Sequence, residues 1–358
     1  MRGVRPPTGA RDYHDDKPVL SPFAKDPDPM TDPQARLSRR AVLATGAAAL
    51  AATAWPAARA DSRTIRLLVG FPAGGGTDAI ARLLAERLRE VLGQPVIVEN
   101  KPGAGGQLAA QALKAAAPDG TTFFISHDHT ISILPLVSRQ PGFDPARDFV
   151  PVAGFADFVN ALALSDATPA RSLREYVDWV RGAGQGKGAI GVPAPASVPE
   201  FLVKVIGDKH GLDLVAAPYR GSAPMITDLL GRQIAAGVGS IPDFIENHRA
   251  GRLKVVAVLG GRRQAAMPEV PTFAELGLAG FEDMPYYGVF APAGTPAEVR
   301  ERFAAALARV ISQREVHARL TAMGLSVGFS DGAKLAAREQ AYRTTWARII
   351  RASGFQPQ

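Results

Sequence analysis

From residue 65 to residue 258 the sequence alternates short β-rich runs with longer runs that carry apolar residues at three-and-four spacing. That spacing is typical of one buried helix face, and short apolar runs bounded by turn residues are typical of buried strands. Regular alternation of the two favours parallel sheets joined by right-handed crossovers, and therefore an α/β architecture. The predicted strands are 65–70, 96–99, 121–125, 161–164, 188–192, 234–238 and 254–258. The predicted helices are 78–92, 107–116, 172–182, 199–209 and 222–231.

After residue 285 the pattern changes to one further strand, 287–291, and two long helices, 296–313 and 331–352. The turn residues near 160 and 285 predict two crossings between lobes. We therefore expect one lobe from 61–160 plus 285–358 and a second from 161–284. A ligand would lie between them, where the carboxyl ends of the strands converge.

Composition excludes several classes of function. The formal net charge is +7, but residues 1–60 hold nine Lys/Arg and six Asp/Glu, which leaves +4 for the remainder. That charge is low and dispersed, so we expect no nucleic-acid partner. The absence of cysteine excludes disulfides, thiol catalysis and thiolate metal sites. The sequence also has no G-x-S-x-G or H-E-x-x-H motif, which argues against hydrolase chemistry.

Residues 1–60 have the character of a leader. A short, weakly hydrophobic run follows Arg39-Arg40, and Ala58-Arg59-Ala60 supplies small residues for cleavage. This pattern is typical of a twin-arginine export signal, and the alternative is a signal-anchor helix. We expect cleavage near Ala60 and a periplasmic protein. Residues 1–37 fit no signal region, so we hypothesise that translation starts at Met30.

A glycine-rich loop, Phe71-Pro72-Ala73-Gly74-Gly75-Gly76-Thr77-Asp78, joins the first strand to the first helix. Gly74, Gly76 and Ala79 satisfy G-x-G-x-x-A, and Glu99 ends the next strand. One interpretation is therefore an exported Rossmann-type NAD(P)-dependent oxidoreductase. A second is a carboxylate-binding loop, and a third is a tight turn with no ligand.

Asp78 weakens the dinucleotide interpretation. With Thr77 as the expected N-cap, the Asp78 carboxylate would itself occupy the positive helix end that a pyrophosphate needs. A second glycine-rich turn, residues 101–106, follows the neighbouring strand. Backbone N–H groups at helix starts can bind a carboxylate without a side-chain cation. The two loops together therefore favour a small organic acid.

Stretches spread over 63–354 resemble the Bug family, the extracytoplasmic solute receptors of tripartite tricarboxylate transporters. Besides the loop at 71–78 they are Gly93-Gln94-Pro95-Val96-Ile97-Val98-Glu99-Asn100-Lys101-Pro102-Gly103-Ala104-Gly105-Gly106, Ala117-Pro118-Asp119-Gly120, Phe143-Asp144-Pro145 with Asp148-Phe149, Pro218-Tyr219-Arg220-Gly221-Ser222-Ala223-Pro224, Asp228-Leu229-Leu230-Gly231, Pro268-Glu269-Val270-Pro271-Thr272, and Phe290-Ala291-Pro292-Ala293-Gly294-Thr295-Pro296. Their order along the chain is that of the family.

The resemblance implies a two-lobed periplasmic-binding-protein fold of type II, a Venus flytrap with a mainly parallel sheet in each lobe. It implies a monomeric receptor with no catalysis, cofactor or metal. The receptor would hold a small carboxylate and deliver it to the membrane subunits of a tripartite tricarboxylate-type transporter. By position, the implied ligand-binding residues are Phe71, Ala73, Gly74, Gly75, Thr77, Asp78, Ser126, Asp128, Thr130, Pro193, Ala194, Ser197, Tyr219, Arg220, Gly221 and Ser240.

Three expected pocket segments depart from the family pattern. Residues 126–130 read Ser-His-Asp-His-Thr, where small hydroxylated residues are usual, and 192–200 contains three prolines, which remove backbone donors. The acid-amide pair usual in a later turn is replaced by Gly239-Ser240. Asp128 would favour a ligand with an amine or hydroxyl, whereas loss of the later acid would favour more negative charge. The two signals disagree.

Other residues carry weaker signals. His127 and His129 flank Asp128, but two imidazoles without a third ligand are weak evidence for a metal. Arg220 would pair with the ligand or with a carboxylate of the other lobe. We expect Tyr286 and Tyr287 to pack in the hinge or core. Tyr342 and Trp346, four residues apart, predict a buried face on the last helix.

Overall fold

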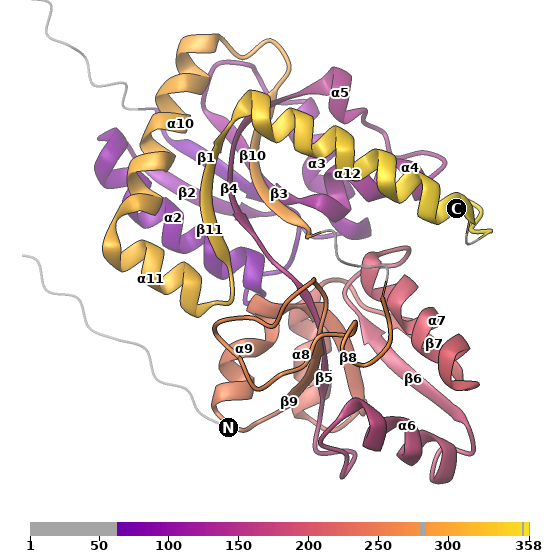
Figure 1. The fold of residues 1–358 in the computed structure, drawn as a ribbon. Helices are drawn as coiled ribbons and strands as arrows, with labels where there is room; N and C mark the ends of the chain where they lie inside the picture. Colours follow the sequence, from indigo (N-terminus) through magenta and orange to yellow (C-terminus); the bar gives the residue numbers. More distant parts are fainter. Residues whose placement is uncertain (1–62, 280–283, 353, 358) are drawn as a thin grey trace, which may run out of the picture. The chain divides into compact units, whose positions relative to one another are not determined.

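Two β-sheets with helices on both faces of each form the core of this computed structural model (Figure 1). The structure describes residues 63–279, 284–352 and 354–357, which fall within one compact unit, Arg59–Gln358. The predicted export signal and the start at Met30 lie outside the described residues. Among the helices of the described residues, none has the length and apolar character needed to span a membrane.

The first sheet has six strands in the order β11-β4-β10-β3-β1-β2. Strands β1 to β4 point the same way, and β10 and β11 run antiparallel to their neighbours. The strands are β1 (Ile65–Val69), β2 (Val96–Asn100), β3 (Thr122–His127), β4 (Phe149–Asp157), β10 (Tyr286–Pro292) and β11 (Ser326–Asp331).

The second sheet has five strands in the order β7-β6-β8-β5-β9. Here β5 alone is antiparallel to its neighbours β8 and β9. The strands are β5 (Asn160–Leu164), β6 (Lys187–Val192), β7 (Asp213–Pro218), β8 (Ala236–Ser240) and β9 (Lys254–Val258). In each sheet the strand that enters from the other sheet, β10 or β5, is antiparallel to its neighbours.

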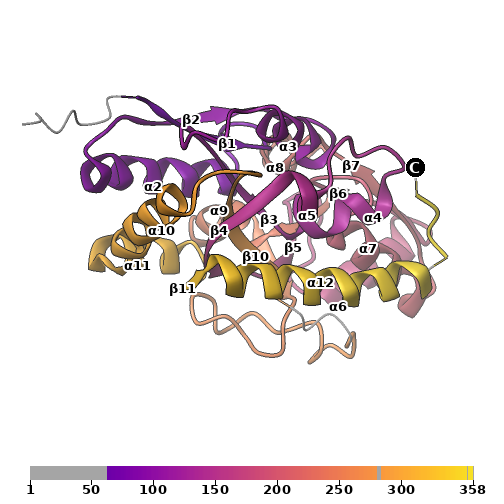
Figure 2. The ribbon, with the colours of Figure 1, turned by 90° about the horizontal axis from the view of Figure 1, so that it is seen from above.

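Side chains that alternate along the strands explain why both faces of the first sheet are covered. In β1, Leu67 and Val69 enter the cluster with α2 and α10, whereas Leu68 enters the cluster with α3 and α12. Figure 2 shows α12 along one side of this sheet and α2 with α10 on the other. The helical segments of this part are α2 (Gly76–Leu92), η1 (Ala104–Gly106), α3 (Gln107–Lys114), the π-helical turn η2 (His129–Ile133), α4 (Leu134–Val137), α5 (Pro145–Asp148), α10 (Ala297–Ser312), α11 (Arg314–Ala322) and α12 (Gly332–Ala352).

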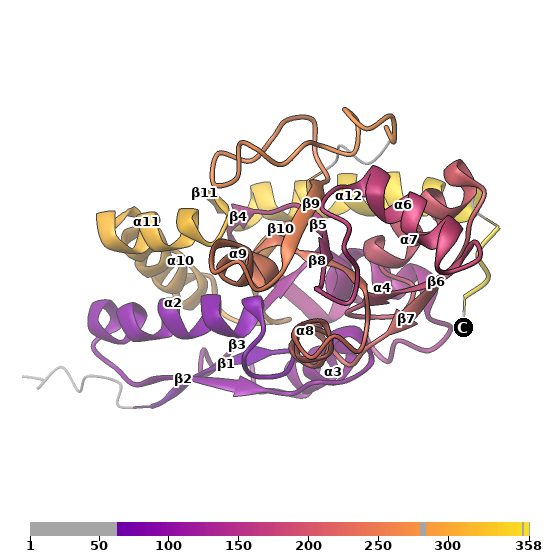
Figure 3. The same ribbon diagram turned by 90° about the horizontal axis from the view of Figure 1, so that it is seen from below.

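The second sheet is covered in the same way. Residues of α6 and α7 pack on one face with Leu162 and Ile190, and residues of α8 and α9 pack on the other with Ala161 and Val258. Figure 3 shows α8 and α9 beside one end of α2 of the first lobe. These helices are α6 (Leu173–Gly182), α7 (Val198–His210), α8 (Ser222–Leu230) and α9 (Ile241–Arg249).

The chain passes from the first sheet to the second between β4 and β5, through Phe158 and Val159. Arg338 of α12 lies at both crossings. Its guanidinium is 2.6 Å from the Asp157 carboxylate at the end of β4, and it donates to the carbonyl of Met284 before β10 (3.0 Å). Burial raises the pKa of Asp157, and the charge of Arg338 opposes this effect. One side chain thus holds both crossing segments to the same helix.

The predicted two-lobed α/β fold is confirmed. The prediction that Thr77 caps the first helix is wrong. Helix α2 begins two residues earlier than predicted, at Gly76, and Gly75 is its N-cap. The Thr77 hydroxyl instead lies 3.2 Å from that of Tyr287, so it ties the helix to β10. Tyr286, like Tyr287, is buried.

Candidate ligand-binding cavity

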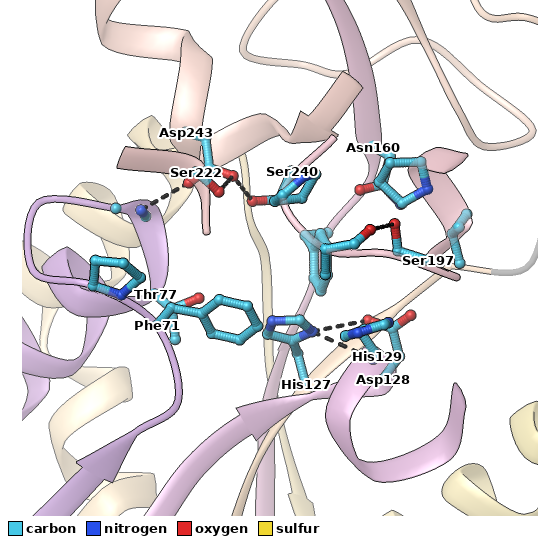
Figure 4. A pocket seen from close by; sticks show the side chains of 18 residues that line it. Phe71, Thr77, His127, Asp128, His129, Asn160, Ser197, Ser222, Ser240 and Asp243 are labelled. Carbon is cyan, nitrogen blue, oxygen red and sulfur yellow. Dashed lines mark hydrogen bonds and ion pairs between the residues drawn. The ribbon is translucent and has the colours of Figure 1, made fainter. Parts of the chain in front are cut away.

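A cavity of about 50 Å³ lies between the two sheets, where β1, β3, β6 and β8 reach their carboxyl ends (Figure 4). Ligands of open α/β sheets bind at such strand ends. The cavity is lined from both lobes by Phe71, Pro72, Gly75, Gly76, Thr77, His127, Asp128, His129, Phe158, Asn160, Pro193, Ala194, Ser197, Val198, Pro199, Ser222, Ser240 and Asp243.

Four helices begin at this cavity. Gly75, Ser197 and Ser240 are the N-caps of α2, α7 and α9, and Ser222 is the first residue of α8. All four line the cavity. Because each helix start carries unpaired N–H groups and a partial positive charge, their convergence favours an anion. The lining residues include no Lys or Arg, so this backbone charge is the main positive contribution at neutral pH.

Asp243, in the first turn of α9, joins the two lobes. Its Oδ1 accepts the backbone N–H of Gly76 (2.8 Å), and its Oδ2 accepts the hydroxyls of Ser222 (2.7 Å) and Ser240 (2.6 Å). Sequence reasoning missed this residue and inferred that the later acid is lost with Gly239-Ser240. That inference is wrong, because Asp243 brings a carboxylate to the same cavity from three residues further on. The helix-start pattern of Ser240 followed by Pro242 and Asp243 was the available signal.

Asp128 lies on the other side of the cavity. Its Oδ2 accepts the hydroxyl of Tyr342 (2.9 Å), and its Oδ1 lies 3.2 Å from Nδ1 of His127. Burial, followed by the charge of Asp128, raises the pKa of Tyr342 well above its usual value, so this hydroxyl stays protonated and donates. The His127 ring stacks on Phe71 with centroids 5.0 Å apart. An aromatic wall therefore stands beside the carboxylate (Figure 4).

His129 is buried and lines the cavity, yet neither of its ring nitrogens has a hydrogen-bond partner within the described part of the chain. Burial, and secondarily the neighbouring His127, lowers its pKa to about 4. The ring is therefore neutral at pH 7. A buried polar group without a partner costs roughly 1–3 kcal/mol, so a ligand or water that satisfied His129 would recover part of that cost.

Asp78, a predicted ligand-binding residue, is turned away from the cavity. Its carboxylate accepts the N–H of Gly74 (3.0 Å), Nε of Arg82 (2.9 Å) and Nδ2 of Asn100 (2.9 Å). Burial alone would raise its pKa, but these hydrogen bonds, led by the one from Arg82, lower it below the ordinary value. Asp78 thus fixes the loop after β1 and stays ionised.

The structure divides the predicted site residues into two groups. Those that line the cavity are Phe71, Gly75, Thr77, Asp128, Pro193, Ala194, Ser197 and Ser240. Those that lie outside its lining are Ala73, Gly74, Asp78, Ser126, Thr130, Tyr219, Arg220 and Gly221. The second group has other partners or surroundings. The Thr130 hydroxyl donates to the carbonyl of Gly105 (2.7 Å), and the Tyr219 hydroxyl donates to Asp228 (2.7 Å).

A separate hollow of about 260 Å³ lies beside the cavity. Residues 103–105 of the second glycine-rich turn line it together with 218–221, and Phe71 borders both spaces. The two glycine-rich loops therefore line different spaces, whereas the sequence had suggested that they bind one ligand together. Arg220 is exposed there and makes no ion pair with any residue that the structure describes, so the expected partner carboxylate is not found.

Three further lining residues escaped sequence reasoning. Phe158 and Asn160 lie at the crossing between the sheets, and Ser222 begins α8. Only Ser222 carried a local signal, because it follows Gly221 at a helix start. No group of three or more metal-ligating side chains occurs within residues 63–279, 284–352 and 354–357.

Comparison with known proteins identifies a family and several solved structures that share this fold. The family described as "Tripartite tricarboxylate transporter family receptor" matches residues 80–355. Protein BugT of Bordetella pertussis is 34% identical over 71% of this chain and 76% of its own length. The structure of periplasmic binding protein BugD has a TM-score of 0.78 and 28% identity, and it covers 83% of this chain and 99% of its own. R. palustris Rpa4515 with adipate has a TM-score of 0.78 and 29% identity, and it covers 85% of this chain and 100% of its own.

A two-lobed α/β fold with a cavity between its sheets is typical of solute-binding proteins, and the similar chains are of this class. The family match over residues 80–355 narrows this class of protein to one family. This protein belongs to the tripartite tricarboxylate transporter receptor family, the Bug family. The family is one of receptors, and it supports the solute-binding interpretation of the glycine-rich loop over the dinucleotide interpretation.

Proposed function

We propose that this protein is a periplasmic receptor that captures a small organic acid between its two lobes and performs no chemistry on it. The convergence of four helix starts on one cavity carries this proposal. Such starts bind a carboxylate through backbone N–H groups, without a lysine or arginine. The adipate in the similar R. palustris structure supports a carboxylate as the ligand class.

The proposed carboxylate site uses Gly75, Ser197, Ser222 and Ser240, one from each helix start. Phe71 and Thr77 complete the first-lobe wall, and Pro193 with Ala194 the second-lobe wall. Outside the proposed carboxylate site lie Ala73, Gly74, Asp78, Ser126, Thr130, Tyr219, Arg220 and Gly221.

We further propose lobe boundaries at residues 160/161 and 284/285, with the chain acting as a monomer. Closure of the lobes over the ligand would then present one surface to the membrane subunits of a tripartite tricarboxylate-type transporter. Such closure is a population shift, and it requires that the ligand bind the closed form more tightly than the open form. The contact between Asp243 and Gly76 supports this scheme, because it joins elements of both lobes.

The experiment is a thermal-shift screen of the purified, signal-free protein against mono-, di- and tricarboxylic acids. A ligand at a hundredfold over its dissociation constant stabilises the folded form by roughly 2.7 kcal/mol, which gives a readily measured rise in melting temperature. The proposal expects at least one acid to produce this shift. No response to any acid would overturn it, and a nicotinamide cofactor in the native mass spectrum and absorbance of the purified protein would favour the dinucleotide interpretation instead.

A further inference from the structure

The charges around the cavity are unbalanced. Asp128 and Asp243 both line it, whereas the lining has no Lys or Arg. The His127 ring contacts the Asp128 carboxylate. Among the described residues, no cationic side chain forms an ion pair with Asp243. Its negative charge therefore faces the cavity without a side-chain counterion.

Asp243 also takes up the donors that would receive a second ligand carboxylate. It accepts the first N–H of α2 and the hydroxyls of Ser222 and Ser240, which start α8 and cap α9. At the fourth helix start, the Ser197 hydroxyl already donates to the carbonyl of Ala194 (2.7 Å). Because each helix start offers several backbone N–H groups, those that remain can receive one carboxylate. The second carboxylate of an entering dicarboxylate would meet these occupied donors and the like charge of Asp243. Buried like charges repel strongly, because little water screens them.

We propose that Asp243 limits the ligand to a single carboxylate group and favours acids that also carry a protonated amine. The ligand class of the cavity is then a small zwitterionic monocarboxylate. This inference rests on the proposed function, because it assigns the charge type of the acid bound at that site. The aromatic rings of Phe71 and Phe158 in the lining suit an ammonium group, since ring faces attract cations.

Calorimetric titration of three matched ligand series tests the proposal. Each series keeps one carboxylate and chain length and changes the far group among hydrogen, ammonium and carboxylate. The series are propanoate, β-alanine and succinate; butanoate, 4-aminobutyrate and glutarate; and pentanoate, 5-aminopentanoate and adipate. In the best-binding series we expect the ammonium acid to bind tightest and the dicarboxylate to bind at least roughly tenfold more weakly than the ammonium acid.

Asp243→Asn keeps the size of the side chain and an acceptor for Gly76, and it removes the charge. We expect it to reduce the ratio of the dissociation constants of dicarboxylate and ammonium acid by roughly tenfold or more. Asp243→Ser is a second variant in case the first fails to fold. Asp228→Asn is the matched control, because Asp228 is on α8 of the same lobe, contacts Tyr219 and lies outside the cavity lining. Asp228→Asn should leave the ratios of the dissociation constants within each ligand series unchanged.

Each outcome has a defined meaning. Tight binding of a dicarboxylate by the unmodified protein would overturn the assignment to Asp243 and leave the proposed function intact. If both Asp243 variants kept the parent's ratio of dissociation constants between dicarboxylate and ammonium acid, the assignment to Asp243 would again be overturned and the proposed function left intact. Failure of every acid in the three series and in the wider acid screen would overturn the proposed function, and this inference with it.

Discussion

At the scale of single residues, Asp78 shows how a predicted ligand contact acts as a structural group. Its three hydrogen bonds hold the loop that presents Gly75 and Gly76 to the cavity. Asp78→Ala would leave buried donors without an acceptor, and we expect it to lower the free energy of unfolding by about 1–3 kcal/mol. Urea denaturation at pH 7 measures this loss.

Asp178→Ala is the control for Asp78. Asp178 is exposed on α6, and its ion pair with Arg181 is long at 3.5 Å and open to solvent. Its removal should therefore change stability by less than about 0.5 kcal/mol. Equal losses in the two variants would mean that the Asp78 hydrogen bonds contribute nothing specific.

His129 makes stability depend on pH. Burial lowers its pKa to about 4 from an ordinary 6.5, so between these values the unfolded chain binds a proton that the folded protein does not. Stability therefore falls as the pH drops from 6.5 to 4, by up to about 3 kcal/mol from this group. We expect His129→Leu to remove this part of the slope in urea denaturation series.

The comparison for His129 is His317→Leu on α11, where the imidazole is exposed. That variant should keep the parent slope between pH 6.5 and 4. If His129→Leu kept it as well, the His129 imidazole would titrate normally in the folded protein.

At the scale of elements, the approach of α2 to α9 sets how closely the lobes meet. A methyl group on Gly76 would lie 2.8 Å from Pro242 and 3.0 Å from the Asp243 carboxylate, both on the opposing lobe. Gly76→Ala should therefore hinder closure without disturbing either lobe core. We expect at least roughly tenfold weaker binding of the most stabilising acid, with little change in melting temperature.

The neighbouring Gly75 provides a matched control, because a methyl group there would have its nearest contacts at 3.7 and 3.9 Å. Gly75→Ala should therefore leave lobe closure intact and keep the backbone N–H of the proposed site, so we expect it to bind more tightly than Gly76→Ala, as measured by calorimetry. A comparable loss of affinity in both variants would locate the effect in the loop and not in lobe closure.

Among the strands that the structure describes, the sequence pattern missed β4, β7 and β11. Strand β7 has alternating exposure with Val215 well exposed, and β11 exposes Phe329; both are edge strands. Edge strands need less apolar sequence, so periodicity gives little signal there. Strand β4 contains Pro151, which faces a register irregularity in β10. Proline in the interior of a sheet argues against a strand unless a bulge accommodates it.

Helix α9 was missed for a related reason. It follows β8 directly, with Ser240 as the last strand residue and also the helix N-cap. A sequence search that expects a loop between strand and helix overlooks such a start, and with it Asp243. The cavity walls at 71–75 and 193–197 were predictable because they belong to loops, whereas Phe158 and Asn160 depend on how the lobes cross.

At the scale of the whole molecule, the proposed export signal would determine where the receptor acts. We expect the double substitution Arg39→Lys and Arg40→Lys to keep the protein in the cytosol, because the twin-arginine route that we propose requires the paired arginines. Fractionation of cells followed by immunoblotting checks this outcome. N-terminal sequencing of the exported form should begin at Asp61, and export of the double variant at the parent level would contradict a twin-arginine route.

The central claim is that one cavity, formed where four helices begin, holds the carboxylate of a small acid. The most direct measurement is a crystal structure grown with the acid that most raises the melting temperature. The account predicts the ligand carboxylate between the lobes, in hydrogen-bond contact with the helix starts at Gly75, Ser197, Ser222 or Ser240. An acid bound elsewhere, with this cavity filled only by solvent, would contradict it.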